Sequence, residues 1–353
     1  MTRILLLSAY RSDSHAAWTD WLLGHIENVE WTVRELPGRH FAWRIRGNPL
    51  SWLDAIPAEP PDLVLASSMV DLATLRGLQP QLVGVPAAYY FHENQFAYPV
   101  SDRQFRTIEP AVVQLYGALA ADQLLFNSGY NQASFLDGVA EFAARMPDRV
   151  PGNLTSRLAA KCQRLPVPVE PVPPASKRDP RLIVWNHRWE YDKRPELFAE
   201  ALCRLADQGV GFRLALLGKR PRQTPPALRR IREQLAERIV VDARLPVERY
   251  RAVLGRAGIA VSTAIHEFQG LGMLEAASAG ALPLVPDGLC YVEQYPDPCR
   301  YPAGEVEALV GTLAAWLEGK RPAPVDIGRW LAPALAPHWA RWLSASAGTI
   351  RST

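Results

Sequence analysis

The feature that most constrains the fold is a proline-rich stretch at residues 165–174 that separates two runs of alternating strand-like and helix-like segments. Its sequence, LPVPVEPVPP, is extended, because proline can continue neither a helix nor a central strand. Short apolar runs lie on both sides of it, at 4–8, 63–66, 87–91, 123–126, 182–186, 213–217 and 259–262. Strands that alternate with helices predict βαβ units and a parallel sheet. We therefore expect two doubly wound α/β domains, at residues 1–168 and 169–353.

The composition is that of an ordinary globular protein. A chain of 353 residues with 48% hydrophobic and 21% charged residues is long enough for more than one core. Its formal net charge of +3 is only mildly basic, so charge alone does not indicate nucleic acid. The four cysteines form no C-x-x-C pair, which favours a reducing compartment. Because no long apolar run is present, we expect a cytoplasmic protein without a membrane span.

Three tryptophans near the C-terminus, Trp330, Trp339 and Trp342, have roughly helical spacing. Tryptophans in a terminal helix usually dock on a core. We expect this helix, although it lies within the range of the second domain, to pack back on the N-terminal domain.

The segment at 264–285, AIHEFQGLGMLEAASAGALPLV, combines two carboxylates with a glycine loop. It predicts a strand end, a loop with Glu267, a short helix with Glu275, and a second apolar strand. Gly270 and Gly272 have no Cβ, so the backbone can approach a ligand closely, and the amides that open the next helix suit a phosphate. The two carboxylates can accept hydrogen bonds from sugar and ribose hydroxyls. Both a nucleotide-sugar site and an ordinary turn between strand and helix fit this pattern.

Arg188 and Lys193 lie in WNHRWEYDKRPE, directly after the first strand of the second half. Arginine can bind phosphate through two hydrogen bonds, and lysine provides a point charge. In a parallel sheet this loop shares an edge with the Glu267 loop, beside the cleft that we expect between the two sheets. This placement favours a joint site for a diphosphate over two separate surface cations.

Polar residues also follow the strands of the first half. His92 follows an apolar strand in YYFHENQFAYP, and its imidazole can bond a sugar hydroxyl or stabilise charge near a reacting carbon. A purely structural histidine is the less favoured alternative. The same loop carries Asn94 and Gln95, and His15 ends the first strand–helix loop. Ser128 follows another strand, where it can bind a hydroxyl or cap a helix.

The segment at 36–46, LPGRHFAWRIR, interleaves basic and aromatic residues. Arg39, Arg44 and Arg46 with Trp43 suit phosphate contacts and base stacking on an exposed nucleotide. A loop that packs its aromatic residues on the first domain is the alternative.

Motifs for other chemistry are missing from the sequence. There is no G-x-G-x-x-G after the first strand and no P-loop, G-x-S-x-G or H-E-x-x-H. A D-x-D that would suggest a metal-bound sugar nucleotide is also absent. We therefore expect metal-independent chemistry.

Glu267 and Glu275 with the glycines between them, together with Arg188 and Lys193, resemble the retaining glycosyltransferases of the GT-B class called family 4. This resemblance covers nearly the whole chain. FHENQFAYP at 91–99, FNS at 126–128, WNHRWEYDKRPE and LPGRHFAWRIR resemble, more narrowly, the tRNA-queuosine α-mannosyltransferase family. The resemblance implies two Rossmann-like domains facing a cleft. It also implies transfer of mannose from GDP-mannose to queuosine in the anticodon of tRNA-Asp, with retention at the anomeric carbon.

The resemblance also implies a role for each matched residue. Arg188 and Lys193 would hold the donor diphosphate beside Gly270 and Leu271, Glu275 the ribose and Glu267 the sugar, with His92 near the reacting centre. The remaining candidates would contact the acceptor: His15, Arg39, Trp43, Arg44, Arg46, Asn94, Gln95 and Ser128. One departure concerns the first strand–helix loop, which has RSDSH at 11–15 where the family has adjacent glycines before Ser-His. This difference affects the geometry of the acceptor loop.

Three other functions remain open from the sequence. The first is a GT-B glycosyltransferase with another nucleotide-sugar donor and a small-molecule or lipid-linked acceptor. The second is a sugar-nucleotide epimerase, which needs no acceptor. The third is an RNA-binding protein with an inactive donor site, which the presence of Arg188, Lys193, Glu267 and Glu275 disfavours.

Overall fold

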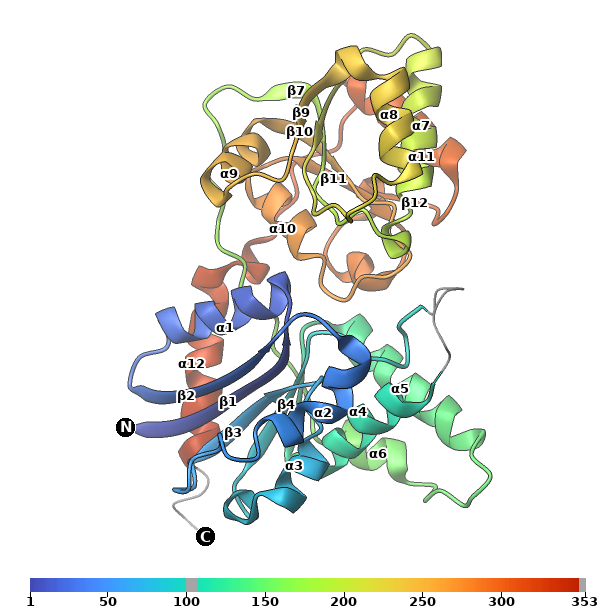
Figure 1. Ribbon diagram of the computed structural model, residues 1–353. Coiled ribbons are helices and arrows are strands. Elements are labelled where there is room, and N and C mark those ends of the chain that lie inside the picture. The colour runs from blue at the N-terminus through green and yellow to red at the C-terminus, as the bar shows by residue number, and fades with distance from the viewer. Residues whose placement is uncertain (100–106, 349–353) are drawn as a thin grey trace. The chain divides into compact units, whose positions relative to one another are not determined.

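The computed structural model describes residues 1–99 and 107–348, and it divides the chain into two compact units (Figure 1). Unit 1 comprises Met1–Pro168 together with Pro333–Thr353, and unit 2 comprises Val169–Ala332. The chain thus leaves unit 1 once and returns to it with the C-terminal helix. In the ranges that the structure describes, no helix is both long enough and apolar enough to cross a bilayer.

Unit 1 is built on a six-stranded parallel sheet in the order β2-β1-β3-β4-β5-β6. Its strands are β1 (Thr2–Arg11), β2 (Val29–Pro37), β3 (Leu63–Ser67), β4 (Ala87–Phe91), β5 (Gln123–Phe126) and β6 (Cys162–Arg164). Its helices are α1 (Asp13–His25), α2 (Phe41–Ser51), α3 (Leu72–Leu78), α4 (Glu109–Ala120), α5 (Gly129–Ala144), α6 (Leu154–Ala159) and α12 (Ala332–Gly348), with a 3-10 turn η1 (Pro80–Leu82). Every residue of β3 and β4 is buried, as expected when helices cover both faces of a parallel sheet.

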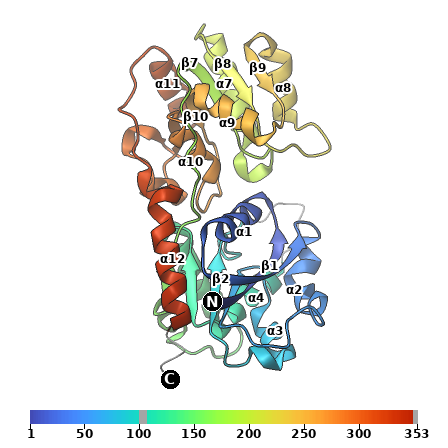
Figure 2. The same ribbon diagram turned by 90° about the vertical axis from the view of Figure 1, so that its left-hand side faces the viewer.

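The C-terminal helix α12 belongs to unit 1 (Figure 2), and two of the three tryptophans predicted for it anchor it there, whereas Trp330 lies before its first residue. Trp339 is fully buried, and its indole Nε1 donates to the carbonyl of Pro166 at 2.9 Å. Trp342 Nε1 donates to Gln123 Oε1 on β5 at 2.7 Å. Each indole therefore buries its rings while its N–H keeps a hydrogen bond.

Unit 2 is built on a second six-stranded parallel sheet, in the order β12-β11-β10-β7-β8-β9. Its strands are β7 (Asp179–Trp185), β8 (Arg213–Leu216), β9 (Ile239–Asp242), β10 (Ala257–Val261), β11 (Leu282–Pro286) and β12 (Arg300–Tyr301). Its helices are α7 (Pro195–Asp207), α8 (Pro226–Gln234), α9 (Val247–Arg256), α10 (Leu271–Ser278) and α11 (Val306–Leu317). Its 3-10 turns are η2 (Tyr191–Lys193), η3 (Ala236–Arg238), η4 (Leu289–Glu293), η5 (Asp297–Cys299) and η6 (Gly328–Trp330).

The strand order of unit 2 reverses between β7 and β10. Helices α7, α8 and α11 cover one face of this sheet, and α9 and α10 cover the other (Figure 1). Such a reversal is where open α/β sheets bind ligands, at the carboxyl ends of the strands. The predicted fold class of two doubly wound parallel sheets is confirmed.

Candidate donor and acceptor sites

The two loops predicted to form a donor site lie side by side in unit 2. Arg188 and Lys193 follow β7, and Glu267 follows β10. These strands are neighbours at the reversal of the sheet, with Ile259 of β10 paired with Ile183 of β7. The backbone N–H of Ile265 donates to the carbonyl of Asp192 at 2.9 Å and joins the loops directly.

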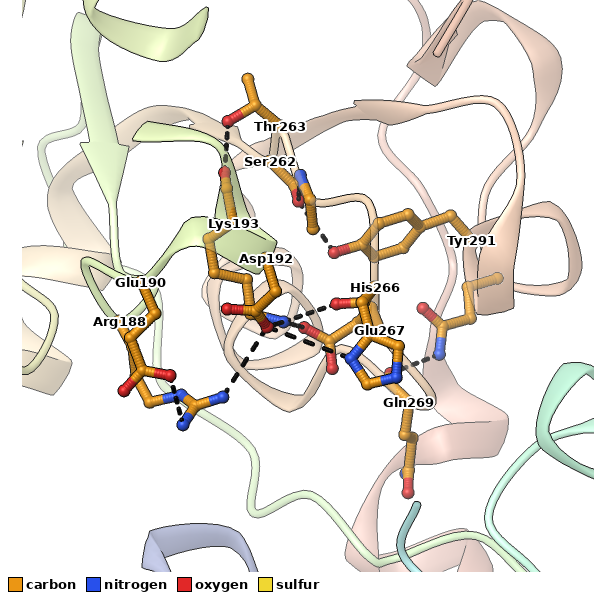
Figure 3. A network of polar contacts seen from close by, with 12 residues as sticks. Arg188, Glu190, Asp192, Lys193, Ser262, Thr263, His266, Glu267, Gln269 and Tyr291 are labelled. Carbon is orange, nitrogen blue, oxygen red and sulfur yellow. Dashed lines mark hydrogen bonds and ion pairs between the residues drawn. The ribbon is translucent and has the colours of Figure 1, made fainter. Parts of the chain in front are cut away.

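Lys193 is the centre of the polar network between these loops (Figure 3). Its side chain is only 7% exposed, and Nζ donates to the carbonyl of His266 at 2.6 Å and to Glu267 Oε2 at 3.0 Å. Asp192 Oδ2 lies 3.2 Å from the same Nζ. The hydroxyl of Thr263, which follows β10, donates to the backbone carbonyl of Lys193 at 2.7 Å and so fixes the backbone of the lysine as well as its side chain. The lysine is thus a buried cation between two carboxylates.

The charges in this network stabilise one another. Burial acts to lower the pKa of Lys193, but the charges of Glu267 and Asp192 outweigh it and raise that pKa. Burial likewise acts to raise the pKa of Glu267, but Lys193 and its neighbours lower it to about 2. Both groups are therefore charged at neutral pH.

Arg188 lies at the exposed end of the same network (Figure 3). Its guanidinium Nη1 is 2.9 Å from Glu190 Oε2, and Nη2 is 3.8 Å from Asp192 Oδ2. The side chain of Arg188 is 46% exposed, whereas that of Asp192 is 1% exposed. Asp192 therefore ties the exposed arginine to the buried lysine. Sequence reasoning missed this residue, although its place directly before Lys193 was a usable signal.

Glu275 lies on α10 and is held by residues from two other elements. Its Oε2 accepts a hydrogen bond from the hydroxyl of Tyr250 on α9 at 2.6 Å. Asn186, directly after β7, donates to that tyrosine oxygen at 3.1 Å and to the carbonyl of Gly272 at 2.7 Å. Burial raises the pKa of Glu275. Tyr250 and Asn186 were not predicted; Asn186 had the same strand-end signal as Arg188, and Tyr250 had none.

The start of α10 is fixed by Gly270. This residue has φ +63°, in the left-handed region, and a Cβ there would lie 2.9 Å from the ring of Tyr291. The helix begins at the next residue, Leu271, and carries Glu275, as the sequence predicted for Glu275. Its first backbone N–H groups have no intrahelical acceptor, so this helix end can bind an anion.

Two histidines beside the network are neutral. Burial lowers the pKa of His187 and that of His266 to about 4. The carbonyl of His266, rather than its ring, accepts the bond from Lys193. Within the part of the chain that the structure describes, no group of three or more His, Cys, Asp or Glu side chains is arranged to hold a metal ion.

In unit 1, His92 and His15 stack on each other. Their ring centroids are 4.1 Å apart, and the side chains are almost fully buried, with His92 after β4 and His15 on α1. Trp18 and Tyr90 contact the His92 ring edge-on, and Trp339 contacts Tyr90. Burial lowers the pKa of His15 to about 4 and that of His92 well below its ordinary value. The sequence-predicted pair is therefore brought together as two neutral imidazoles.

The other candidates around His92 serve the structure of their loop. Asn94 is fully buried, donates to Asn131 Oδ1 at 2.9 Å and accepts from the N–H of Ala97 at 2.9 Å. Ser128 is the N-cap of α5 and accepts from the N–H of Asn131 at 3.0 Å. Gln95 is half-buried, and its N–H donates to Gln114 Oε1 at 2.7 Å. The placement of Asn94 and Ser128 supports a positioning role rather than direct contact with an acceptor.

The basic-aromatic segment at 36–46 is only partly a loop. His40 has φ +58° and precedes α2, so Trp43, Arg44 and Arg46 lie on a helix. Arg46 Nη1 is 2.5 Å from the buried carboxylate of Asp71, which holds this arginine on unit 1. Arg44 has one buried guanidinium nitrogen. Arg39 is exposed and Trp43 is 55% exposed, so these two remain available to a ligand.

Comparisons with known proteins agree with this architecture. The family model described as the N-terminal part of tRNA-queuosine alpha-mannosyltransferase matches residues 3–169. A tRNA-queuosine alpha-mannosyltransferase of Drosophila melanogaster is 35% identical to this chain over 307 residues, which cover 83% of this chain and 81% of that protein.

Solved structures share the fold of the whole chain. HepE of Anabaena in complex with UDP has a TM-score of 0.69 at 12% identity, over 98% of this chain and 100% of that one. The lipopolysaccharide outer core galactosyltransferase WaaB in its apo form has a TM-score of 0.64 at 12% identity, over 98% of this chain and 99% of that one. The expected GT-B fold is thereby confirmed.

Proposed function

This chain belongs to the tRNA-queuosine α-mannosyltransferase family, and from that premise we propose that it transfers mannose from GDP-mannose to queuosine in the anticodon of tRNA-Asp. The observation that carries the proposal is that Asp192 holds both Arg188 and Lys193 in one loop at the strand-order reversal of unit 2. Two cations and a helix N-terminus form a site for a diphosphate. The enzyme is a hexosyltransferase.

In this proposal the protein acts mainly by stabilising the leaving group. The bond from the anomeric carbon to the diphosphate oxygen breaks, and a bond from the same carbon to an acceptor hydroxyl forms on the same face. The hydroxyl proton passes to the departing diphosphate. Arg188, Lys193 and the amides at Leu271 hold the charge that develops on that diphosphate. We infer that these groups suffice without a metal ion.

The remaining polar groups would orient the two ends of the donor. Glu275 would accept hydrogen bonds from the ribose hydroxyls, since Tyr250 occupies only one of its oxygens. Glu267, kept ionised by Lys193, would accept from the sugar hydroxyls. His92 is assigned to the donor sugar near the reacting carbon, where a neutral imidazole offers both a donor and an acceptor.

The decisive experiment is mass spectrometry of queuosine-containing tRNA after incubation with the protein and a panel of nucleotide sugars. We expect a hexose on queuosine with GDP-mannose only. Transfer from another nucleotide sugar would contradict the proposed donor, and the absence of a hexose on the tRNA would contradict the proposed acceptor. GDP-mannose with protein alone should stay unchanged, and an epimerised sugar there would identify an epimerase.

Glu275→Ala is expected to weaken GDP-mannose binding by on the order of tenfold or more, because a hydrogen bond to a charged group contributes about 1.5–3 kcal/mol. The measurement is titration calorimetry with GDP-mannose. The matched variant Tyr250→Phe keeps the carboxylate and loses only the hydroxyl that contacts it, so its effect should be smaller. Unchanged affinity in Glu275→Ala would remove this residue from the donor site.

For the acceptor, Arg39→Ala combined with Trp43→Ala should raise the KM for tRNA several-fold and leave the KM for the donor unchanged. The reason is that these are the exposed members of the basic-aromatic segment, and an aromatic stacked on a base contributes about 1–3 kcal/mol. Arg46→Ala serves as a contrast, because its ion pair with Asp71 makes loss of thermal stability the expected result. If neither KM changes in the double variant, this segment does not bind RNA.

A further inference from the structure

Positive charge is concentrated in one part of unit 2. Residues 213–256 contain 12 lysines and arginines but only 4 aspartates and glutamates, in a chain whose formal net charge is +3. This segment extends from β8 through α8 and β9 to the end of α9. The sequence motif at its start, KRPR at 219–222, plays no part in the donor site described above.

Several of these cations serve the fold. Arg220 and Arg232 both pair with Asp242 at the end of β9. Arg213 Nη2 is 2.6 Å from Asp179, and Arg238 donates to a backbone carbonyl while its guanidinium lies over the ring of Phe212. These side chains are committed to neighbours within unit 2.

Six other cations of this segment are exposed and have no acidic partner among the residues that the structure describes, and four of them lie near the carboxyl ends of the strands. We call these four residues the basic rim: Lys219, Arg222, Arg229 and Arg249. Their positions share one property. Lys219 and Arg222 lie in the loop after β8, and Arg229 and Arg249 lie in the first turns of α8 and α9. All four are therefore at the carboxyl ends of the strands.

The basic rim adjoins the donor loop. The N–H of Trp189 donates to the carbonyl of Lys219 at 3.1 Å. Gly218 packs so closely on the loop after β7 that a Cβ there would lie 1.5 Å from the carbonyl oxygen of His187. The loop after β8 is thus fixed against the loop that carries Arg188 and Lys193.

Two physical arguments indicate that the rim serves a polyanion. The donor diphosphate carries two negative charges, which Arg188 and Lys193 already match, so four further cations exceed what the donor needs. In addition, a helix N-terminus disfavours positive side chains by about 0.3–1 kcal/mol each. The first turn of α8, which carries Arg229, contains no acidic residue, whereas the first turn of α9 carries Glu248 beside Arg249. The placement of the two arginines there does not stabilise the helices.

We propose that the basic rim binds the phosphate backbone of the acceptor tRNA, on the same edge of unit 2 as the donor site. This inference rests on the proposed function in that the polyanion is taken to be RNA. Contacts with phosphates supply most sequence-independent affinity for nucleic acid, and they position the substrate without selecting a base. The rim would therefore contribute to tRNA affinity and leave recognition of queuosine to other residues.

The test is the triple variant Arg222→Glu, Arg229→Glu, Arg249→Glu, compared with the wild-type protein in binding to an unmodified tRNA transcript at several salt concentrations. We expect affinity at low salt to fall by on the order of tenfold or more, and the slope of log K against log salt to decrease by about one for each lost phosphate contact. Glutamate in a first helical turn is favourable, so unfolding is not the expected cause.

The matched control is Arg256→Glu, compared with the single variant Arg249→Glu, because it makes the same charge change at the opposite end of α9, where Arg256 is also exposed. It should leave tRNA affinity nearly unchanged. An equal loss in this control, or an unchanged salt slope in the triple variant, would overturn the proposal. A parallel loss of GDP-mannose affinity in the triple variant would assign the rim to the donor and overturn it too. Binding is measured on an unmodified transcript, which contains no queuosine. A failure of mannosyl transfer would therefore contradict the proposed function without affecting the test of the basic rim.

Discussion

Lys193→Met is expected to reduce kcat/KM for GDP-mannose by at least about a hundredfold, since in the proposed mechanism this buried cation stabilises the negative charge that develops on the diphosphate. The same change leaves Glu267 and Asp192 without the cation between them. Removing one partner of a buried ion pair costs about 3 kcal/mol or more. Steady-state kinetics and thermal unfolding of this variant should therefore both change.

The double variant Lys193→Met, Glu267→Gln separates the two effects. It removes the charge of Glu267 and leaves Asp192 near Arg188, so we expect its melting temperature to rise towards that of the wild-type protein while activity stays low. Glu190→Gln is the matched control, because Glu190 contacts Arg188 at the exposed end of the network. That variant should retain the fold and the activity. Near-normal turnover in the double variant would contradict the assignment of Lys193 to the diphosphate.

The pH dependence of stability follows from the same pair. The pKa of Glu267 is about 2 in the folded protein, below its ordinary value of 4.5, so its contribution is present above pH 4.5 and is lost as pH falls towards 2. In Lys193→Met the pKa of Glu267 is governed mainly by burial, which raises it. The variant should therefore lose less unfolding free energy than the wild-type protein between pH 5 and pH 3, as measured by denaturant titration.

Much of the candidate donor site was predictable because it depends on strand ends. Arg188, Lys193 and Glu267 each follow an apolar run, and in a parallel sheet the carboxyl ends of neighbouring strands meet at one edge. The structure brings these three side chains into one network, as the spacing predicted. Their contacts with a ligand remain predictions.

The parts that sequence reasoning missed depend on contacts between distant elements. Tyr250 reaches Glu275 from another helix, and no local pattern around Tyr250 indicates that contact. Asn94 and Arg46 look like ligand groups in the sequence, yet Asn94 bonds Asn131 and Arg46 pairs with Asp71. When a polar residue follows a strand, the sequence predicts that it lies at the carboxyl end of the sheet. The sequence does not predict whether its polar atoms can bind a ligand, because residues far away in the sequence can already bond them.

His92→Phe is expected to lower kcat by on the order of a hundredfold with little change in the KM for GDP-mannose. Phenylalanine keeps the ring that stacks on His15 and contacts Trp18, but it removes both nitrogens. Loss of one preorganised hydrogen-bonding group at a reacting centre costs about 10²–10³ in kcat. Because burial holds the pKa of His92 well below its ordinary value, the wild-type rate should not depend on its protonation between pH 6 and pH 8.

The acid stability of the variants distinguishes this role from a structural one. The folded pKa of His15 is about 4, below the unfolded value near 6.5, so the unfolded chain binds more protons as pH falls through this range. Stability is therefore full above pH 6.5 and is lost towards pH 4, and the same sign holds for His92. His15→Phe and His92→Phe should each reduce this acid loss. If both variants stabilise the fold at pH 5 but only His92→Phe lowers kcat, His92 acts in the reaction. If the two variants have the same kcat, both histidines are structural. The comparison is matched because each substitution removes one imidazole from the same stacked pair.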